Sequence, residues 1–140
     1  MKVLKHSLLI VFVVLAFFSC NARIPEEQKT EITASEDIQV YYFHNTMRCA
    51  TCNAVEDETK MALEMFYGEK MKAGTIAFTS LNLEEEEGEK LAQTLQVSGQ
   101  TLLITKGDTR VNLTNEGFMN ARTNPTRFHE ILKSQIDQLL

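Results

Sequence analysis

The sequence predicts one α/β domain in which helices flank a mixed sheet. Strand-like apolar segments alternate with amphipathic helical segments, and a glycine-containing connection of hairpin length joins the last two strands. The 140 residues, 44% hydrophobic and 24% charged, suit a single globular domain. Strands joined through helices pair in parallel, whereas strands joined by a hairpin pair antiparallel. The expected order is therefore strand, helix, strand, helix, strand, strand, helix.

The N-terminal segment is expected to be an export signal over residues 1–19. Lys2 and Lys5 precede an apolar run over residues 8–18, which is shorter than a membrane span and typical of a secretory signal peptide. The run ends at Cys20 in a pattern that resembles a relaxed lipobox of bacterial lipoproteins. Lipid attachment at Cys20 is therefore expected, and a simple secretory signal or an uncleaved anchor helix is the alternative.

The segment that follows is polar, and it is expected to be a tether over residues 20–36 between the membrane and a domain over residues 37–140. Removal of residues 1–19 takes away two lysines and no acid, which leaves 12 of the 14 Lys and Arg side chains against 19 Asp and Glu. This acidic balance argues against nucleic acid as a partner. The lipid anchor predicts the extracytoplasmic side of a bacterial cell envelope.

The first half of the domain shows a change of period. Residues 38–43 (IQVYYF) are β-branched or aromatic apart from Gln39, which indicates a short strand covered on both faces. From Cys49, apolar residues recur at spacings of three and four, so a helix is expected that frays or kinks at Gly68 and ends before Gly74. Its apolar face carries Cys52, Val55, Thr59, Ala62, Leu63 and Phe66, and its opposite face carries Asn53, Glu56 and Lys60.

The second half continues the alternation with a strand over residues 75–83 and a helix over residues 84–97. The first turn of this helix is rich in glutamate, which complements the positive end of a helix. Two short strands over residues 101–105 and 110–114 then flank Lys106-Gly107-Asp108, a connection of hairpin length.

A terminal helix is expected to close the chain. Asn124 and Pro125 are typical of the N-cap and the first position of a helix. His129 is expected on the solvent face of this helix.

Two cysteines at the start of the first helix carry the predicted chemistry. A thiolate is the reactive form of cysteine, and the free N–H groups and partial positive charge of a helix N-terminus stabilise it. Arg48 adds a full positive charge next to Cys49. Cys49 is therefore expected to be accessible with a low pKa, and Cys52, one turn further on the apolar face, is expected to be sheltered. Disulfide exchange needs this combination of an exposed attacking thiol and a resolving thiol.

The strand, the CATC motif at a helix start, the later segment LQVSGQTLLITKGD and the terminal helix resemble the thioredoxin-like family over residues 37–140. This resemblance implies a βαβαββα fold in which Cys49 is the nucleophile and Cys52 resolves the mixed disulfide. The family's glycine, threonine and apolar strand find matches in Gly99, Thr101 and residues 102–104.

The loop beside the dithiol departs from this family. Gln100 stands where the family carries a cis-proline, and a cis bond before any other residue costs about 2.5–4 kcal/mol. A trans bond and a reshaped loop next to the two cysteines are therefore expected at Gln100. The chain has no tryptophan, so the family's usual tryptophan before the motif is absent as well.

Metal binding is the main alternative. Met47-Arg48-Cys49-x-x-Cys52 resembles the metal-binding loop of small copper and heavy-metal chaperones, whose sulfur ligands suit monovalent copper. Topology disfavours those modules, because here a helix falls between the second and third strands. On a thioredoxin-like frame, Cys49, Cys52 and His44 would still offer two sulfurs and a nitrogen. A third possibility is a binding domain in which the disulfide is only structural.

Taken together, the sequence favours a thiol–disulfide oxidoreductase whose redox group is the Cys49–Cys52 pair, with no further cofactor. Its expected partners are envelope proteins that carry thiols or disulfides and a redox partner that recharges the pair. The reduction potential and that redox partner set the direction of exchange.

Overall fold

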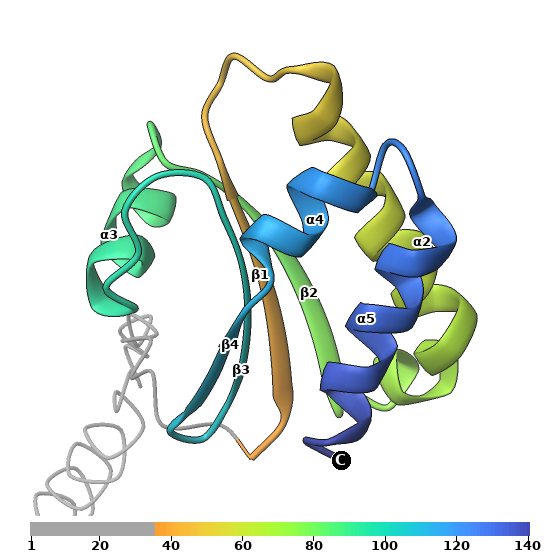
Figure 1. Ribbon diagram of the computed structural model, residues 1–140. Helices are drawn as coiled ribbons and strands as arrows, with labels where there is room; N and C mark the ends of the chain where they lie inside the picture. Colours follow the sequence, from red (N-terminus) through yellow and green to blue (C-terminus); the bar gives the residue numbers. More distant parts are fainter. Residues whose placement is uncertain (1–35) are drawn as a thin grey trace, which may run out of the picture. The chain divides into compact units, whose positions relative to one another are not determined.

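The computed structural model describes residues 36–140, which form a four-stranded sheet with helices on both faces (Figure 1). The predicted signal peptide, Cys20 and residues 20–35 of the tether lie outside the described residues. Within the described chain, no helix has both the length and the apolar character that a bilayer span requires. The elements in chain order are β1 (Ile38–His44), α2 (Ala50–Lys72), β2 (Ile76–Asn82), α3 (Glu86–Thr94), β3 (Thr101–Lys106), β4 (Thr109–Asn112), α4 (Thr114–Asn120) and α5 (Pro125–Asp137).

The sheet has the strand order β2-β1-β3-β4. β1 pairs in parallel with β2, with Ile38 opposite Ile76, and antiparallel with β3, with Phe43 opposite Thr101. β3 and β4 form an antiparallel hairpin, and Gly107 takes a positive φ of 53° in the two-residue turn between them. The predicted α/β class, with a mixed sheet and an edge hairpin, is confirmed.

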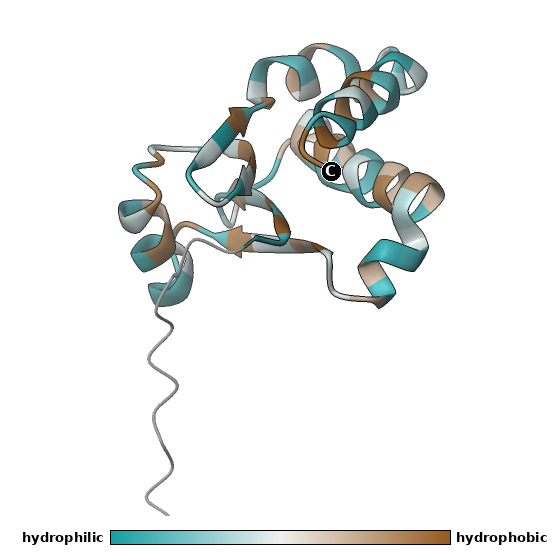
Figure 2. Cartoon of the chain, turned by 90° about the horizontal axis from the view of Figure 1, so that it is seen from below, coloured by the Kyte–Doolittle hydropathy of each residue, from teal (hydrophilic) through white to brown (hydrophobic). Residues whose placement is uncertain are grey.

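The helices divide between the two faces of the sheet. α2, α4 and α5 cover one face and α3 covers the other, and hydrophobic residues of the helices face inward (Figures 1 and 2). β1 contributes to both cores because its side chains alternate, with Tyr42 in the larger core and Phe43 in the smaller one. The prediction that β1 is covered on both faces is therefore confirmed.

The short helix α4 was not predicted. Its sequence TNEGFMN contains Gly and Asn, which have low helix propensity, so local pattern alone does not indicate a helix there. Tertiary packing accounts for it, because a Cβ atom at Gly117 would lie 3.2 Å from a methyl group of Val55 on α2. The missing side chain lets α4 approach α2 closely.

The expectations about helix faces are wrong at Phe66 and at His129. α2 is kinked at Tyr67, which has non-helical φ and ψ of −133° and 19°. Tyr67 is buried, and its hydroxyl donates to the Lys133 carbonyl oxygen at 3.0 Å, whereas Phe66 is 38% exposed. His129 was expected on the solvent face of α5, but it is buried against α2, where its Nε2 lies 2.7 Å from Glu58 Oε2. Tyr67 and His129 are buried because both lie where α2 packs against α5.

Close packing of α3 against the end of β2 holds the loop that precedes the two cysteines. A Cβ atom at Gly88 would lie 2.0 Å from the Asn82 carbonyl oxygen, so only glycine fits there. The Asn82 side-chain amide donates to Thr46 Oγ1 at 2.9 Å, and the Thr46 backbone N–H donates to Glu84 Oε1 at 3.2 Å. The loop between β1 and α2 is thus attached to the β2–α3 connection.

Candidate functional site

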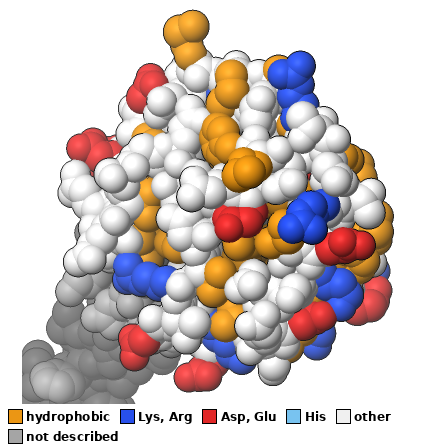
Figure 3. Space-filling view, in the orientation of Figure 1, with side chains coloured by type: hydrophobic (Ala, Val, Ile, Leu, Met, Phe, Trp, Pro, Cys, Tyr) orange, Lys and Arg blue, Asp and Glu red, His pale blue; other side chains and the backbone are white. Residues whose placement is uncertain are grey.

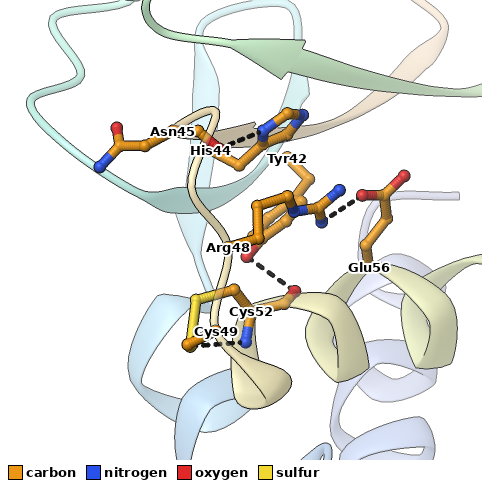
Figure 4. The surroundings of a disulfide bond; sticks show 7 residues. All are labelled: Tyr42, His44, Asn45, Arg48, Cys49, Cys52 and Glu56. Atoms are coloured by element: carbon orange, nitrogen blue, oxygen red, sulfur yellow. Dashed lines mark hydrogen bonds and ion pairs between the residues drawn. A yellow bond between two sulfur atoms is a disulfide. The ribbon is translucent and has the colours of Figure 1, made fainter.

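A disulfide between Cys49 and Cys52 lies at the start of α2, with their Cα atoms 5.0 Å apart (Figure 4). Cys49 is the N-cap of the helix, with an extended backbone of φ −82° and ψ 164°. Its Sγ accepts the Cys52 backbone N–H at 3.1 Å. A thiolate on Cys49 would therefore meet both this N–H group and the positive end of α2, and each of them lowers a thiol pKa.

The two cysteines differ sharply in exposure. Cys49 is exposed, whereas only 3% of Cys52 is accessible. Cys52 lies on the face of α2 that packs on the sheet, and the Tyr42 hydroxyl of β1 donates to its carbonyl oxygen at 2.9 Å. Exchange with a partner can therefore begin at Cys49, while Cys52 can reach the Cys49 sulfur but not a sulfur of a separate protein.

This difference predicts unequal alkylation of the reduced, full-length protein near neutral pH. We expect iodoacetamide to label Cys49 many times faster than Cys52, because Cys49 is the exposed N-cap and Cys52 is covered. Mass spectrometry after brief exposure to the reagent gives the two rates separately. Equal rates, or faster labelling of Cys52, would contradict this division of the two thiols.

Arg48 does not lie where the sequence suggested. Its guanidinium was expected to place a positive charge beside Cys49, but its side chain runs away from the disulfide and forms an ion pair with Glu56 (Figure 4). The guanidinium also lies over the Tyr42 ring, 5.6 Å from the ring centroid.

The sequence pattern did not indicate Glu56 as part of this site. It was assigned to the outer face of the helix, yet only 7% of the residue is exposed. Burial raises the pKa of Glu56, but hydrogen bonds from Lys60 and Arg48 and their charges outweigh burial and hold that pKa below its ordinary value. Glu56 is therefore an anion at neutral pH. The only sequence signal was its spacing of four residues from Lys60, which also suits an ordinary surface pair.

The sequence also placed His44 and Gln100 near the motif. His44 Nδ1 donates to the Asn45 carbonyl oxygen at 3.0 Å, and the His44 and Tyr42 rings lie 6.0 Å apart. Gln100 directly precedes β3, whose first residue pairs with Phe43 near the end of β1. Gln100 therefore lies at the end of the central strands from which the motif loop leaves. As expected of a residue other than proline, Gln100 has a trans bond, since the described chain contains no cis peptide bond.

A preformed metal site is not apparent among residues 36–140, where no group of three His, Cys, Asp or Glu side chains is arranged to hold a metal ion. Ligation by Cys49 and Cys52 would also require the reduced thiolates. The set of Cys49, Cys52 and His44 therefore remains a hypothesis from the sequence.

Exposed apolar side chains lie just before the disulfide in the chain and on α4. Met47, two residues before Cys49, is 88% exposed, and Met119 of α4 is 73% exposed. Figure 3 shows hydrophobic side chains at the surface in the upper part of that view, where the β1–α2 loop and α4 lie. Methionine adapts its shape to varied apolar partners.

No known protein family matches the sequence, and no curated protein matches it either. Among solved structures, the chain is similar to chloroplastic thioredoxin z, with 20% identity over 74% of this chain and 80% of the other and a TM-score of 0.48. It is also similar to thioredoxin from Trypanosoma brucei brucei, with 14% identity over 73% and 80% of the two chains and a TM-score of 0.43. A malarial protein shares 20% identity over 53% of this chain and 74% of its own, with a TM-score of 0.40. Similarity at this level carries no activity over, so the function proposed next is inferred from this chain's own residues.

Proposed function

We propose that this protein is a thiol–disulfide oxidoreductase that acts through the Cys49–Cys52 pair on proteins of a bacterial cell envelope. The observation that carries the proposal is a disulfide at a helix N-terminus in which one sulfur is exposed and the other is buried. A purely structural disulfide does not require an exposed sulfur at the N-cap. The lipobox-like segment ending at Cys20 supports a lipid anchor on the extracytoplasmic side.

The exchange has two balanced steps. The Cys49 thiolate attacks one sulfur of a substrate disulfide, which forms a bond between Cys49 and the substrate and releases the other substrate sulfur as a thiolate. The Cys52 thiolate then attacks Cys49 Sγ, which forms the Cys49–Cys52 disulfide and releases the second substrate thiolate. The substrate is reduced by two electrons and the protein is oxidised by two. The reverse sequence oxidises a substrate dithiol.

Substrate recognition is proposed to use the surface around Cys49. The exposed Met47 next to the motif suits an apolar or flexible stretch of a partner protein. Gln100 lies at the end of the central strands from which the motif loop leaves, and it is proposed to contact the bound segment in place of the family's proline. A second envelope protein would recharge the pair after each turnover, and no further cofactor is needed.

Catalysis of exchange tests the proposal in both directions. The full-length protein is expected to accelerate the reduction of insulin by dithiothreitol, or the oxidation of reduced ribonuclease by glutathione disulfide, and Cys49→Ser is expected to lose the acceleration because the attacking thiol is gone. Met61→Ala, a change at an exposed position on α2 away from the motif, serves as the matched control. A folded wild-type protein that accelerates neither reaction would refute the proposal.

A further inference from the structure

An ion pair beside the disulfide joins the residue before Cys49 to the helix that follows it. Arg48 and Glu56 contact one another, and their side chains are only 22% and 9% exposed. Glu56 lies one turn beyond Cys52 on the same helix. Because the pair is largely shielded from water, solvent screens these charges less than it would at the surface.

The pair has a defined orientation relative to the disulfide. The Arg48 guanidinium is held between Glu56 and the Tyr42 ring and points away from the two sulfurs (Figure 4). Tyr42 is fully buried, and its hydroxyl donates a hydrogen bond to the Cys52 carbonyl oxygen. The Tyr42 ring that contacts the guanidinium is therefore held in place. Arg48 adjoins Cys49 in the chain, so without its carboxylate partner its flexible side chain could turn toward the Cys49 sulfur.

This arrangement bears on the redox pair because a thiolate exists only in the reduced form. A positive charge near the attacking sulfur stabilises that thiolate, which stabilises the dithiol over the disulfide and makes the pair more oxidising. A negative charge has the opposite effect. A neutralised arginine that is turned away adds little to either form.

We propose that Glu56 is a positioning residue that neutralises Arg48 and holds it away from Cys49, and thereby keeps the reduction potential of the pair lower than a free arginine would. The proposal rests on the proposed function in that this potential governs exchange with partners. Lys60, the other cation on Glu56, is half exposed and lies two turns beyond Cys52, so it contributes less at the sulfurs.

Equilibration with glutathione tests this role. Two glutathione thiols reduce the Cys49–Cys52 disulfide and leave as one glutathione disulfide, and rapid alkylation then gives the reduced fraction of the full-length protein. Glu56→Gln is expected to shift this equilibrium about tenfold toward the dithiol, which is about 30 mV for a two-electron couple. It should also move the alkylation–pH profile of Cys49 to lower pH. Arg48→Met is expected to leave the equilibrium nearly unchanged, because the arginine that it removes is already neutralised and turned away from the sulfurs.

The double variant Arg48→Met/Glu56→Gln distinguishes positioning of Arg48 from a direct effect of the Glu56 charge. If Glu56 acts through Arg48, the Glu56→Gln change should have much less effect once Arg48 is absent, so the two substitutions should not be additive. Glu69→Gln is the matched control, because it removes a carboxylate that is paired with Lys72 on the same helix but at its far, exposed end. We expect no shift for this control.

Three results would overturn the proposal: an unchanged equilibrium in Glu56→Gln, an equal shift in Glu69→Gln, or an equal effect of Glu56→Gln with and without Arg48. Removal of one partner from a shielded pair destabilises proteins, so thermal unfolding is measured for every variant. If Glu56→Gln does not fold, Arg48→Met alone decides, since a clear shift toward the disulfide in that variant would show that Arg48 already acts on Cys49 and would contradict the proposal. The glutathione equilibrium involves no protein substrate, so failure here leaves the proposed exchange activity untouched.

Discussion

The Cys52→Ser variant is expected to accumulate covalent adducts with partner proteins in the cells that produce it. Cys49 is exposed at the N-cap of α2 and can still attack a substrate disulfide, but serine cannot complete the second step, so the mixed disulfide persists. Non-reducing gels of cells treated with an alkylating agent at lysis should show higher-mass bands that contain the protein. These bands should collapse when a reductant is added.

The matched control is Cys49→Ser, which keeps one thiol in the motif but places it at the buried position. We expect this variant to give far fewer adducts, because 3% exposure leaves Cys52 poorly accessible to another protein. A structural disulfide or a metal carrier has no reason to trap partners through Cys49 alone. The oxidoreductase proposal would fail if a folded Cys52→Ser variant gave no more reductant-sensitive adducts than the variant that lacks both cysteines.

Gly88→Ala is expected to cause the largest loss of stability among the Gly→Ala substitutions in this chain. The new Cβ would lie 2.0 Å from the Asn82 carbonyl oxygen, and this contact is with backbone rather than with a mobile side chain. Either α3 or the end of β2 must move, and overpacking of this kind costs about 1–3 kcal/mol or more. Thermal unfolding should therefore shift downward by several degrees per kcal/mol.

Gly68→Ala is the control for this substitution. Gly68 also lies within a helix, but a Cβ atom added there would meet no neighbouring side chain or strand within 4 Å, so alanine should leave stability unchanged or raise it by up to about 1 kcal/mol. Equal unfolding temperatures for Gly88→Ala and wild type would show that the packing of α3 on β2 is looser than the structure indicates. Asn82 also holds Thr46, so Gly88→Ala is expected to loosen the β1–α2 loop before the disulfide as well.

The α/β class, the succession of strands and helices apart from α4, and the position of the two cysteines follow from the sequence alone. Strands and helices show apolar periods of two and of three to four residues, and these periods can be read from neighbouring residues in the sequence. Helix caps are equally local: the Asn124 side chain accepts the Arg127 backbone N–H at 3.3 Å, and Pro125 begins α5, as predicted. The change of period after β1 placed Cys49 at a helix start and Cys52 on its buried face. Both positions agree with the structure, because the helical repeat alone fixes the relative positions of two residues that lie three apart in the chain.

The burial of particular polar side chains and the direction of Arg48 depend on tertiary packing. The helical period places Glu56 on a face that is expected to be solvated. Glu56 becomes part of the site because it forms an ion pair with Arg48, which directly precedes Cys49. His129 and Glu58 meet although 71 residues separate them, because α5 packs on α2. The helical period says which residues share a face, but it does not say what packs against that face, and the free energy of a charged group depends on those neighbours.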